Sequence, residues 1–368
     1  MLAARTAKCT HRSLMPKWDQ LPAASRCFSA RSWLQSNETS AASVATDFLA
    51  RFRSIGPQSR VQALDANQLQ LLSLTLNRPT LYPGSPALSN SPASLAAGTP
   101  LPPGYHLVYC TPAFLEAELG PDGTDASYNP RAPFTRRMWA GGEVAWPRKA
   151  DGRPNPLRVG QQVRETTTVL SAEPKVVRKT GEEMIVVGVE KEFSNEQGVA
   201  LFDRRNWVFR KALTMPPPSQ GTPSSNATPV PPPTAPASST TTTTGTIHTR
   251  TLRQTAVTLF RFSALTFNPH KIHYSTPWAR DVEGHRDIVV HGPLNLISIL
   301  DLWRDTRPSA DGDPAQLLPA SISYRATSPL YAEEEYRIVM DETAGDGVAR
   351  IQIIAPGDQV AMKAEIRS

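Results

Sequence analysis

Cysteine is scarce in this sequence, with three residues in a chain of 368, so a scaffold built on disulfides is excluded. No run approaches the roughly 18 apolar residues that span a bilayer, which excludes an integral helical membrane protein. Aromatic residues make up only 7%, yet 39% of the residues are hydrophobic. That share can form a buried core and excludes a wholly disordered chain.

Acidic residues are nearly missing from the first 36 positions, which hold six basic side chains and one acid, Asp19. This Arg-, Ser- and Ala-rich leader without an apolar stretch is typical of a mitochondrial transit peptide, and a disordered basic tail is the alternative. The remaining chain carries 33 basic and 32 acidic side chains, so the overall charge of +6 belongs mostly to the leader. A nearly neutral body argues against a nucleic-acid binder. Without the leader only Cys110 remains, and we expect it in a core.

Proline runs and a run of threonines divide the body into two blocks. Residues 216–246 contain two Pro-Pro-Pro triplets and five consecutive threonines, a composition that cannot pack a core and predicts a disordered linker. The folded blocks are then 45–215 and 247–368.

Local patterns predict mixed helix and strand in each block. In the first block, the spacing of Asp65 and Gln68 is typical of a helix start, and three leucines follow on one face before Pro79. An apolar helix is expected at 293–303, because proline is tolerated at a first helical position. The expected strands are 161–171, 184–193, 200–210, 256–262, 321–327, 334–340, 347–354 and 359–366.

The two blocks resemble each other. Residues 156–164 align with 329–337 in their proline, leucine and final arginine, and three predicted strands follow in both places. The alternative is a chance likeness between two strand starts. The duplication predicts that each copy is one antiparallel sheet around one helix, with the copies paired edge to edge to cover open edges.

Histidine clusters before the second predicted helix. His270, His273, His285 and His291 lie within 22 residues, and Gly292 follows at the helix start. Backbone N–H groups at a helix start stabilise an oxyanion, and a nearby histidine moves protons near neutral pH. Zinc is the alternative for His270 and His273, but no cysteine pair lies near, so neither metal nor cofactor is predicted.

This segment resembles the MaoC-like, hydratase-2 superfamily of hot-dog dehydratases, and most closely the mitochondrial 3-hydroxyacyl-thioester dehydratase type 2 group with its mesaconyl-CoA hydratase relatives. The likeness rests on Phe-Asn-Pro-His-Lys-Ile-His-Tyr at 267–274, Val-His-Gly at 290–292, and Arg-Arg-Met-Trp-Ala-Gly-Gly at 136–142. It implies an α+β double hot-dog fold, in which two antiparallel sheets each wrap a helix. The N-terminal hot-dog domain (45–215) would be degenerate and the C-terminal one (247–368) catalytic.

The resemblance also assigns the site. His273 matches the family's histidine and is the expected base, Gly292 the expected oxyanion donor, and Asn268 stands where the superfamily has aspartate. Because an amide does not titrate, Asn268 is expected to orient a hydroxyl group only. Residues expected to contact or support the substrate are His270, His291, Arg136 and Arg137, with a structural salt bridge as the alternative for the two arginines.

The implied function is reversible dehydration of (3R)-hydroxyacyl thioesters on acyl carrier protein, in fatty acid synthesis of the mitochondrial matrix. The alternatives are an acyl-CoA hydratase of organic-acid metabolism, similar to mesaconyl-CoA hydratase, and a non-catalytic acyl-thioester-binding protein. The expected partners are acyl carrier protein or a CoA thioester, without nucleic acid or a membrane span. The chain is expected as a monomer that forms an internal pseudo-dimer, or as a homodimer.

Overall fold

The computed structural model describes residues 40–90, 95–178, 180–213, 237, 239–307, 314 and 317–368. The predicted leader (1–36) and most of the predicted linker lie outside the described residues. Within the described part of the chain, no helix is long and apolar enough to cross a membrane.

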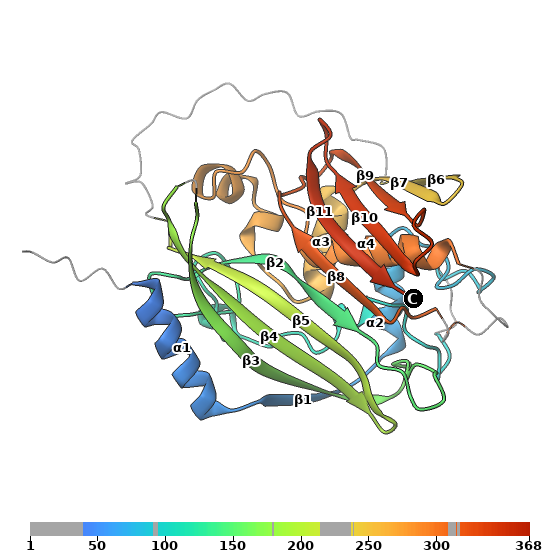
Figure 1. Ribbon diagram of the computed structural model, residues 1–368, viewed down its shortest axis with the longest axis horizontal. Coiled ribbons are helices and arrows are strands. Elements are labelled where there is room, and N and C mark those ends of the chain that lie inside the picture. Colours follow the sequence, from blue (N-terminus) through green and yellow to red (C-terminus); the bar gives the residue numbers. More distant parts are fainter. Residues whose placement is uncertain are drawn as a thin grey trace, which may run out of the picture. The chain divides into compact units, whose positions relative to one another are not determined.

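One antiparallel sheet of eleven strands organises the fold, in the order β1-β3-β4-β5-β2-β8-β11-β10-β9-β7-β6 (Figure 1). The strands of the N-terminal half are β1 (Gln58–Ala63), β2 (Arg136–Ala145), β3 (Gln162–Val176), β4 (Glu183–Asn195) and β5 (Gly198–Arg210). Those of the C-terminal half are β6 (Ser239–Thr244), β7 (Ile247–Arg253), β8 (Ser321–Ala326), β9 (Glu335–Asp341), β10 (Val348–Ile354) and β11 (Val360–Arg367).

The helices are α1 (Ala41–Ile55), α2 (Ala66–Thr75), α3 (Ala256–Leu265) and α4 (Gly292–Asp305). Short helical turns are η1 (Tyr105–Val108), η2 (Glu116–Glu118), η3 (Lys271–His273) and η4 (Trp278–Val282).

The two halves repeat one topology, as the duplication predicted. Strands β1, β3, β4, β5 and β2 occupy the same order as β7, β9, β10, β11 and β8. The aligned segments 156–164 and 329–337 lead into β3 and β9, and three strands follow in both places. The halves join where β2 pairs antiparallel with β8, from Gly141 opposite Arg325 to Ala145 opposite Ser321. This edge-to-edge pairing forms the predicted double hot-dog fold, with the two sheets continuous as one.

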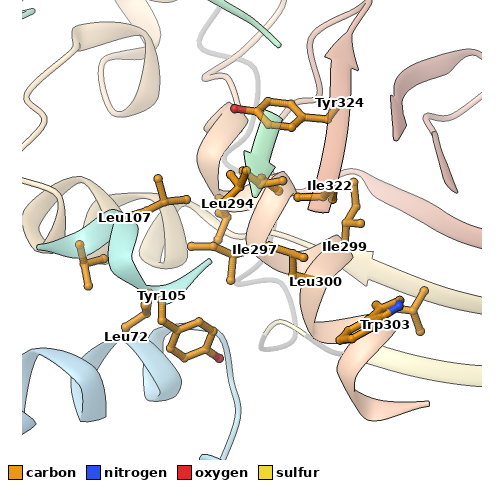
Figure 2. Packing of buried hydrophobic residues seen from close by; sticks show 14 of the residues in the cluster. Leu72, Tyr105, Leu107, Leu294, Ile297, Ile299, Leu300, Trp303, Ile322 and Tyr324 are labelled. Carbon is orange, nitrogen blue, oxygen red and sulfur yellow. The ribbon is translucent and has the colours of Figure 1, made fainter. Parts of the chain in front are cut away.

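Helix α4 lies at the centre of the larger core. All eleven residues from Leu294 to Arg304 are buried, and Figure 2 shows Ile297 and Leu300 between η1 and the sheet. The buried Arg304 guanidinium binds Asp301 on the same helix at 2.8 Å. In the N-terminal half, the described residues between α2 and β2 hold the short turns η1 and η2 and no α-helix, and α1 covers another part of the sheet through contacts with β3 and β4.

Most predicted elements are confirmed, but the strand predicted at 256–262 is wrong. These residues form α3, whose N-terminus is capped by the Thr255 side chain accepting a hydrogen bond from the Thr258 N–H. The buried positions Thr258, Leu259 and Phe262 follow helical spacing, which outweighs the β-branched residues that suggested a strand.

The end of the predicted linker is also ordered. Thr240–Thr244 belongs to β6, which pairs with β7 around a turn at residues 245–246, so a disordered linker extending to 246 is wrong. Threonine is β-branched and pairs well at a sheet edge even when every side chain is exposed. Cys110 is a free, buried thiol, as expected, and burial raises its pKa to about 11.

Ile297→Ala should lower the free energy of unfolding by about 2–5 kcal/mol, because it removes buried methyl groups from a fully enclosed position in α4. Val257→Ala on α3, where the side chain is 60% exposed, is the matched control and should change stability by less than about 0.5 kcal/mol. Urea unfolding of both variants checks this. Equal losses would contradict the central place of α4 in the core.

Candidate active site

The loop after α3 positions the predicted site residues. Helix α3 ends at Leu265, and its C-cap residue Thr266 donates its hydroxyl hydrogen to the Phe262 carbonyl oxygen. Pro269, a few residues later, cannot continue a helix. Asn268 lies just before this proline, and its side-chain oxygen accepts a hydrogen bond from the His270 N–H at 3.3 Å. This asparagine turn directs the chain into η3, which carries His273 at its last position.

His273 is held in one tautomer. Its Nδ1 lies 2.7 Å from the Val289 carbonyl oxygen, an acceptor only, so Nδ1 carries the hydrogen and Nε2 keeps its lone pair. Burial lowers the pKa of His273 to about 4, with the Val289 hydrogen bond working in the opposite direction. The ring is therefore neutral at physiological pH and able to accept a proton at Nε2.

His291 connects His273 to the start of α4. The two rings stack with centroids 3.6 Å apart, and His291 Nε2 lies 2.9 Å from the Ser263 hydroxyl oxygen on α3. His291 is also the N-cap residue of α4, so the residue that follows it is Gly292. The structure thus brings together His273, His291 and the opening residue of α4.

Gly292 begins α4 without a side-chain cap from His291. A Cβ at this position would lie 2.9 Å from Cδ1 and 3.0 Å from Cγ of Trp139, so glycine is required by the close approach of the indole. Trp139 comes from β2, the strand of the N-terminal half that pairs with β8, and it stacks with Tyr324 of β8. In the sequence, Trp139 stands out only as part of the motif at 136–142, which does not indicate its contact with Gly292.

His270 is the third histidine of the cluster. Its ring lies 5.3 Å from that of His273, and burial, followed by the charge of a protonated His273 and of Arg137, lowers its pKa well below the usual value. Burial, followed by the charges of His273 and His270, lowers the pKa of His291. His285 lies farther out, half-buried beside Tyr331, and does not join the stack.

Arg136 and Arg137 lie on β2, near enough for their charges to lower the pKa of His270. Each guanidinium contacts a carboxylate of the protein. Arg136 Nε lies 2.5 Å from Glu283, while Arg137 lies 3.4 Å from Asp125 and stacks on the Trp207 ring. A direct role in binding substrate stays a prediction for both residues.

Several buried polar atoms around the cluster have no hydrogen-bond partner among the described residues. They are Nε2 of His270, Nδ1 of His291, and the indole nitrogens of Trp139 and Trp278. Since buried polar atoms are normally satisfied, this group of donors and acceptors suits a polar ligand. Within the described ranges, no group of three or more His, Cys, Asp or Glu side chains can hold a metal ion.

Comparison with known proteins identifies the family. A family model described as hydroxyacyl-thioester dehydratase type 2 matches residues 104–332, which is more than half of the chain and includes the whole histidine cluster. The chain belongs to the hydroxyacyl-thioester dehydratase type 2 family. As a member of this dehydratase family, it is an enzyme of the hydro-lyase class.

Curated relatives of the dehydratase family cover most of their own length in the match. Mesaconyl-C(4)-CoA hydratase of Chloroflexus aurantiacus is 30% identical over 247 residues, covering 66% of this chain and 75% of that protein. The mitochondrial hydroxyacyl-thioester dehydratase type 2 of Schizosaccharomyces pombe is 25% identical over 263 residues, covering 67% and 79%. That of Saccharomyces cerevisiae is 23% identical over 283 residues, covering 72% and 85%.

Solved structures support the fold of this dehydratase. A MaoC-like dehydratase from Phytophthora capsici superposes with a TM-score of 0.54 at 13% identity, covering 85% of this chain and 94% of that one. Another MaoC-like dehydratase superposes with a TM-score of 0.56 at 10% identity, covering 84% and 96%. At these identities the likeness concerns the fold alone.

Acidification should destabilise the protein through the buried histidines. Between pH 6.5 and 4 an unfolded histidine binds a proton that folded His273 does not, so the free energy of unfolding falls as the pH drops. At pH 5 the loss from His273 alone is about 2 kcal/mol. Urea unfolding at pH 7 and pH 5 measures it, and His273→Gln should show a drop that is smaller by about this amount. The same drop in wild type and variant would mean that His273 is not buried as a neutral ring.

Proposed function

We propose that the chain catalyses the reversible removal of water from (3R)-3-hydroxyacyl thioesters, giving trans-2-enoyl thioesters. The observation that carries this proposal is the stack of His273 on His291 at the start of α4, with Nε2 of His273 free to accept a proton. Membership of the dehydratase family supports the reaction class.

His273 takes the α-proton in this proposal. The Cα–H bond breaks, its proton moves to Nε2, and the electron pair spreads into the thioester carbonyl as an enolate. The Val289 carbonyl oxygen on Nδ1–H stabilises the imidazolium that forms. The Cβ–O bond then breaks, the hydroxyl group receives the proton back from Nε2, and water leaves as the Cα–Cβ double bond forms.

Gly292 stabilises the enolate oxygen. Its N–H is one of the free donors at the first turn of α4, where the helix dipole favours negative charge. Pro293 has no N–H, so the Gly292 N–H is the donor nearest the helix start. His291 positions this amide as the N-cap residue and presses on the His273 ring.

The other predicted residues hold the substrate. Asn268 orients a hydroxyl group of the substrate from its place beside His270, whose backbone N–H donates a hydrogen bond to the Asn268 side chain. Arg136 and Arg137, although paired with carboxylates, add positive potential near the cluster, and this favours the phosphate groups of a pantetheine carrier.

The acyl carrier is acyl carrier protein, and the pathway is mitochondrial fatty acid synthesis. This finer assignment draws on the two yeast relatives, whose names place them in mitochondria, and on the Arg-rich, acid-poor leader. A second candidate is hydration of a CoA thioester of an organic acid in the matrix. It is favoured by the mesaconyl-C(4)-CoA hydratase relative, which has the highest identity of the three.

His273→Ala should reduce hydration of crotonyl-CoA by the purified chain at least about 100-fold, since a positioned base contributes about 10²–10⁴ to the rate. Loss of the enoyl absorbance measures it. The matched control is His248→Gln on β7, a histidine that contacts Thr243 and Glu342 instead of the cluster, and it should retain full activity. A wild-type chain without turnover would favour the non-catalytic alternative, and an active His273→Ala would contradict the assignment of the base.

Crotonyl thioesters of acyl carrier protein should give a kcat/KM at least about 10-fold above crotonyl-CoA, because protein docking adds steered association to the same chemistry. The comparison includes mesaconyl-C(4)-CoA at equal concentration. A preference for mesaconyl-C(4)-CoA over both crotonyl thioesters would overturn the fatty acid assignment in favour of the second candidate.

A further inference from the structure

A carboxylate from the N-terminal half faces the histidine cluster. Oδ2 of Asp122 lies 3.8 Å from Nε2 of His270, and both side chains are about one-tenth exposed. Asp122 belongs to the loop between η2 and β2, about 150 residues before the histidines, and no sequence motif pointed to it. The cluster's own loop offers no such group at the equivalent place, since Asn268 carries an amide.

The Asp122 loop is built to hold this side chain. Its other oxygen, Oδ1, accepts hydrogen bonds from the Thr124 N–H at 2.9 Å and the Thr124 hydroxyl at 2.8 Å. The Asp122 carbonyl accepts the Lys271 N–H at 2.8 Å, which ties the loop directly to η3. Gly123 is required here, because a Cβ would lie 2.2 Å from the Pro269 carbonyl oxygen and the backbone has a φ of +84°.

These contacts leave one oxygen of Asp122 aimed at one nitrogen of His270. Their separation of 3.8 Å is too long for a direct hydrogen bond, but an oxygen atom placed between them reaches both at about 2.8 Å. Nε2 of His270 is buried and has no partner among the described residues. A hydroxyl group satisfies both atoms, because it accepts a hydrogen bond from Nε2–H and donates one to the carboxylate.

We propose that Asp122 Oδ2 and His270 Nε2 together bind the 3-hydroxyl group of the substrate, and the water formed from it. The proposal rests on the dehydratase function proposed above and adds a substrate-contacting residue from the N-terminal half. The hydroxyl oxygen is held on the side of His270 while His273, whose ring is 5.3 Å away, removes the α-proton and returns it to that oxygen. Asp122 and His270 end each turnover in the protonation state in which they began.

The pair of Asp122 and His270 gives both halves of the chain a part in the proposed site. The base and the oxyanion donor come from the C-terminal half, whereas one contact to the departing hydroxyl comes from the N-terminal half. A C-terminal half alone would lack the Asp122 carboxylate. The N-terminal half then has a chemical role besides completing the sheet.

Asp122→Asn tests the proposal in the full chain. The amide keeps an oxygen for Thr124 but replaces the charged acceptor at Oδ2, so kcat for crotonyl-CoA hydration should fall about 100-fold with KM changed less than about 3-fold. Asp151→Asn is the matched control, because Asp151 accepts the Arg153 N–H in the same kind of turn away from the histidines. It should retain wild-type kcat.

A double-mutant cycle separates shared binding of the hydroxyl from two independent effects. His270→Gln alone should lower kcat by a similar factor, and the double variant Asp122→Asn/His270→Gln should fall no more than about 10-fold further, because both residues hold one oxygen. Thermal unfolding is measured for each variant to check that it folds. If Asp122→Asn does not fold, Asp122→Ser replaces it in the same assays, because serine keeps a local turn hydrogen bond.

The outcomes distinguish the two proposals. If the wild type is active and Asp122→Asn keeps more than a third of its kcat, the proposed binding of the hydroxyl by Asp122 and His270 is wrong. The same holds if the losses of the two single variants multiply in the double variant. In both cases the dehydratase function still stands. A folded wild type without activity on any of the three thioesters, on carrier protein or CoA, overturns the function and with it the proposed binding of the hydroxyl.

Discussion

The stack of His273 on His291 is the contact on which the site depends. His273 belongs to the loop after α3, and His291 is the N-cap of α4, so their rings bring a base and a helix start to one place. The Ser263 hydroxyl on α3 holds Nε2 of His291, and the Val289 carbonyl oxygen holds Nδ1 of His273. Nδ1 of His291 has no partner among the described residues, and Nε2 of His273 keeps its lone pair. Burial keeps both rings neutral, which is the state a base requires.

The double hot-dog fold repeats one topology in two halves whose helices differ. Both halves keep the same strand order, and they join through β2 and β8. The C-terminal half has the long buried helix α4, whereas the described residues in the corresponding place of the N-terminal half form only the short turns η1 and η2. Instead of a second helix start, the N-terminal half contributes Trp139 against Gly292 and Asp122 against His270. The proposed site therefore takes residues from both halves.

The sequence was sufficient for features that depend on local pattern. The Asp65 cap, the apolar helix after Gly292 and seven of the eight expected strands are present, because caps and side-chain periodicity act over a few residues. The strand predicted at 256–262 is wrong. Val257 and Phe260, whose β propensity suggested a strand, are exposed on α3, so that propensity did not indicate which residues are buried. Helix α1 and strands β1, β2, β6 and β7 were not predicted from the sequence.

Contacts between distant segments were beyond sequence reasoning. His273 and Gly292 were paired through a short motif, but Asp122 and Trp139 reach the cluster only through the folding of a loop and a strand of the other half. Arg136 and Arg137 were expected to meet a ligand, and the ion pairs with Glu283 and Asp125 could not be foreseen from spacing. Long-range packing decides such positions, and a single sequence does not encode it in any local signal.

A crystal structure with a non-hydrolysable 3-hydroxybutyryl thioester analogue tests the central claim most directly. We expect the carbonyl oxygen within about 3 Å of the Gly292 nitrogen and the α-carbon within about 3.5 Å of Nε2 of His273, the range of reactive contacts. An analogue bound with its carbonyl away from the start of α4, or with its α-carbon out of reach of His273, would contradict the account.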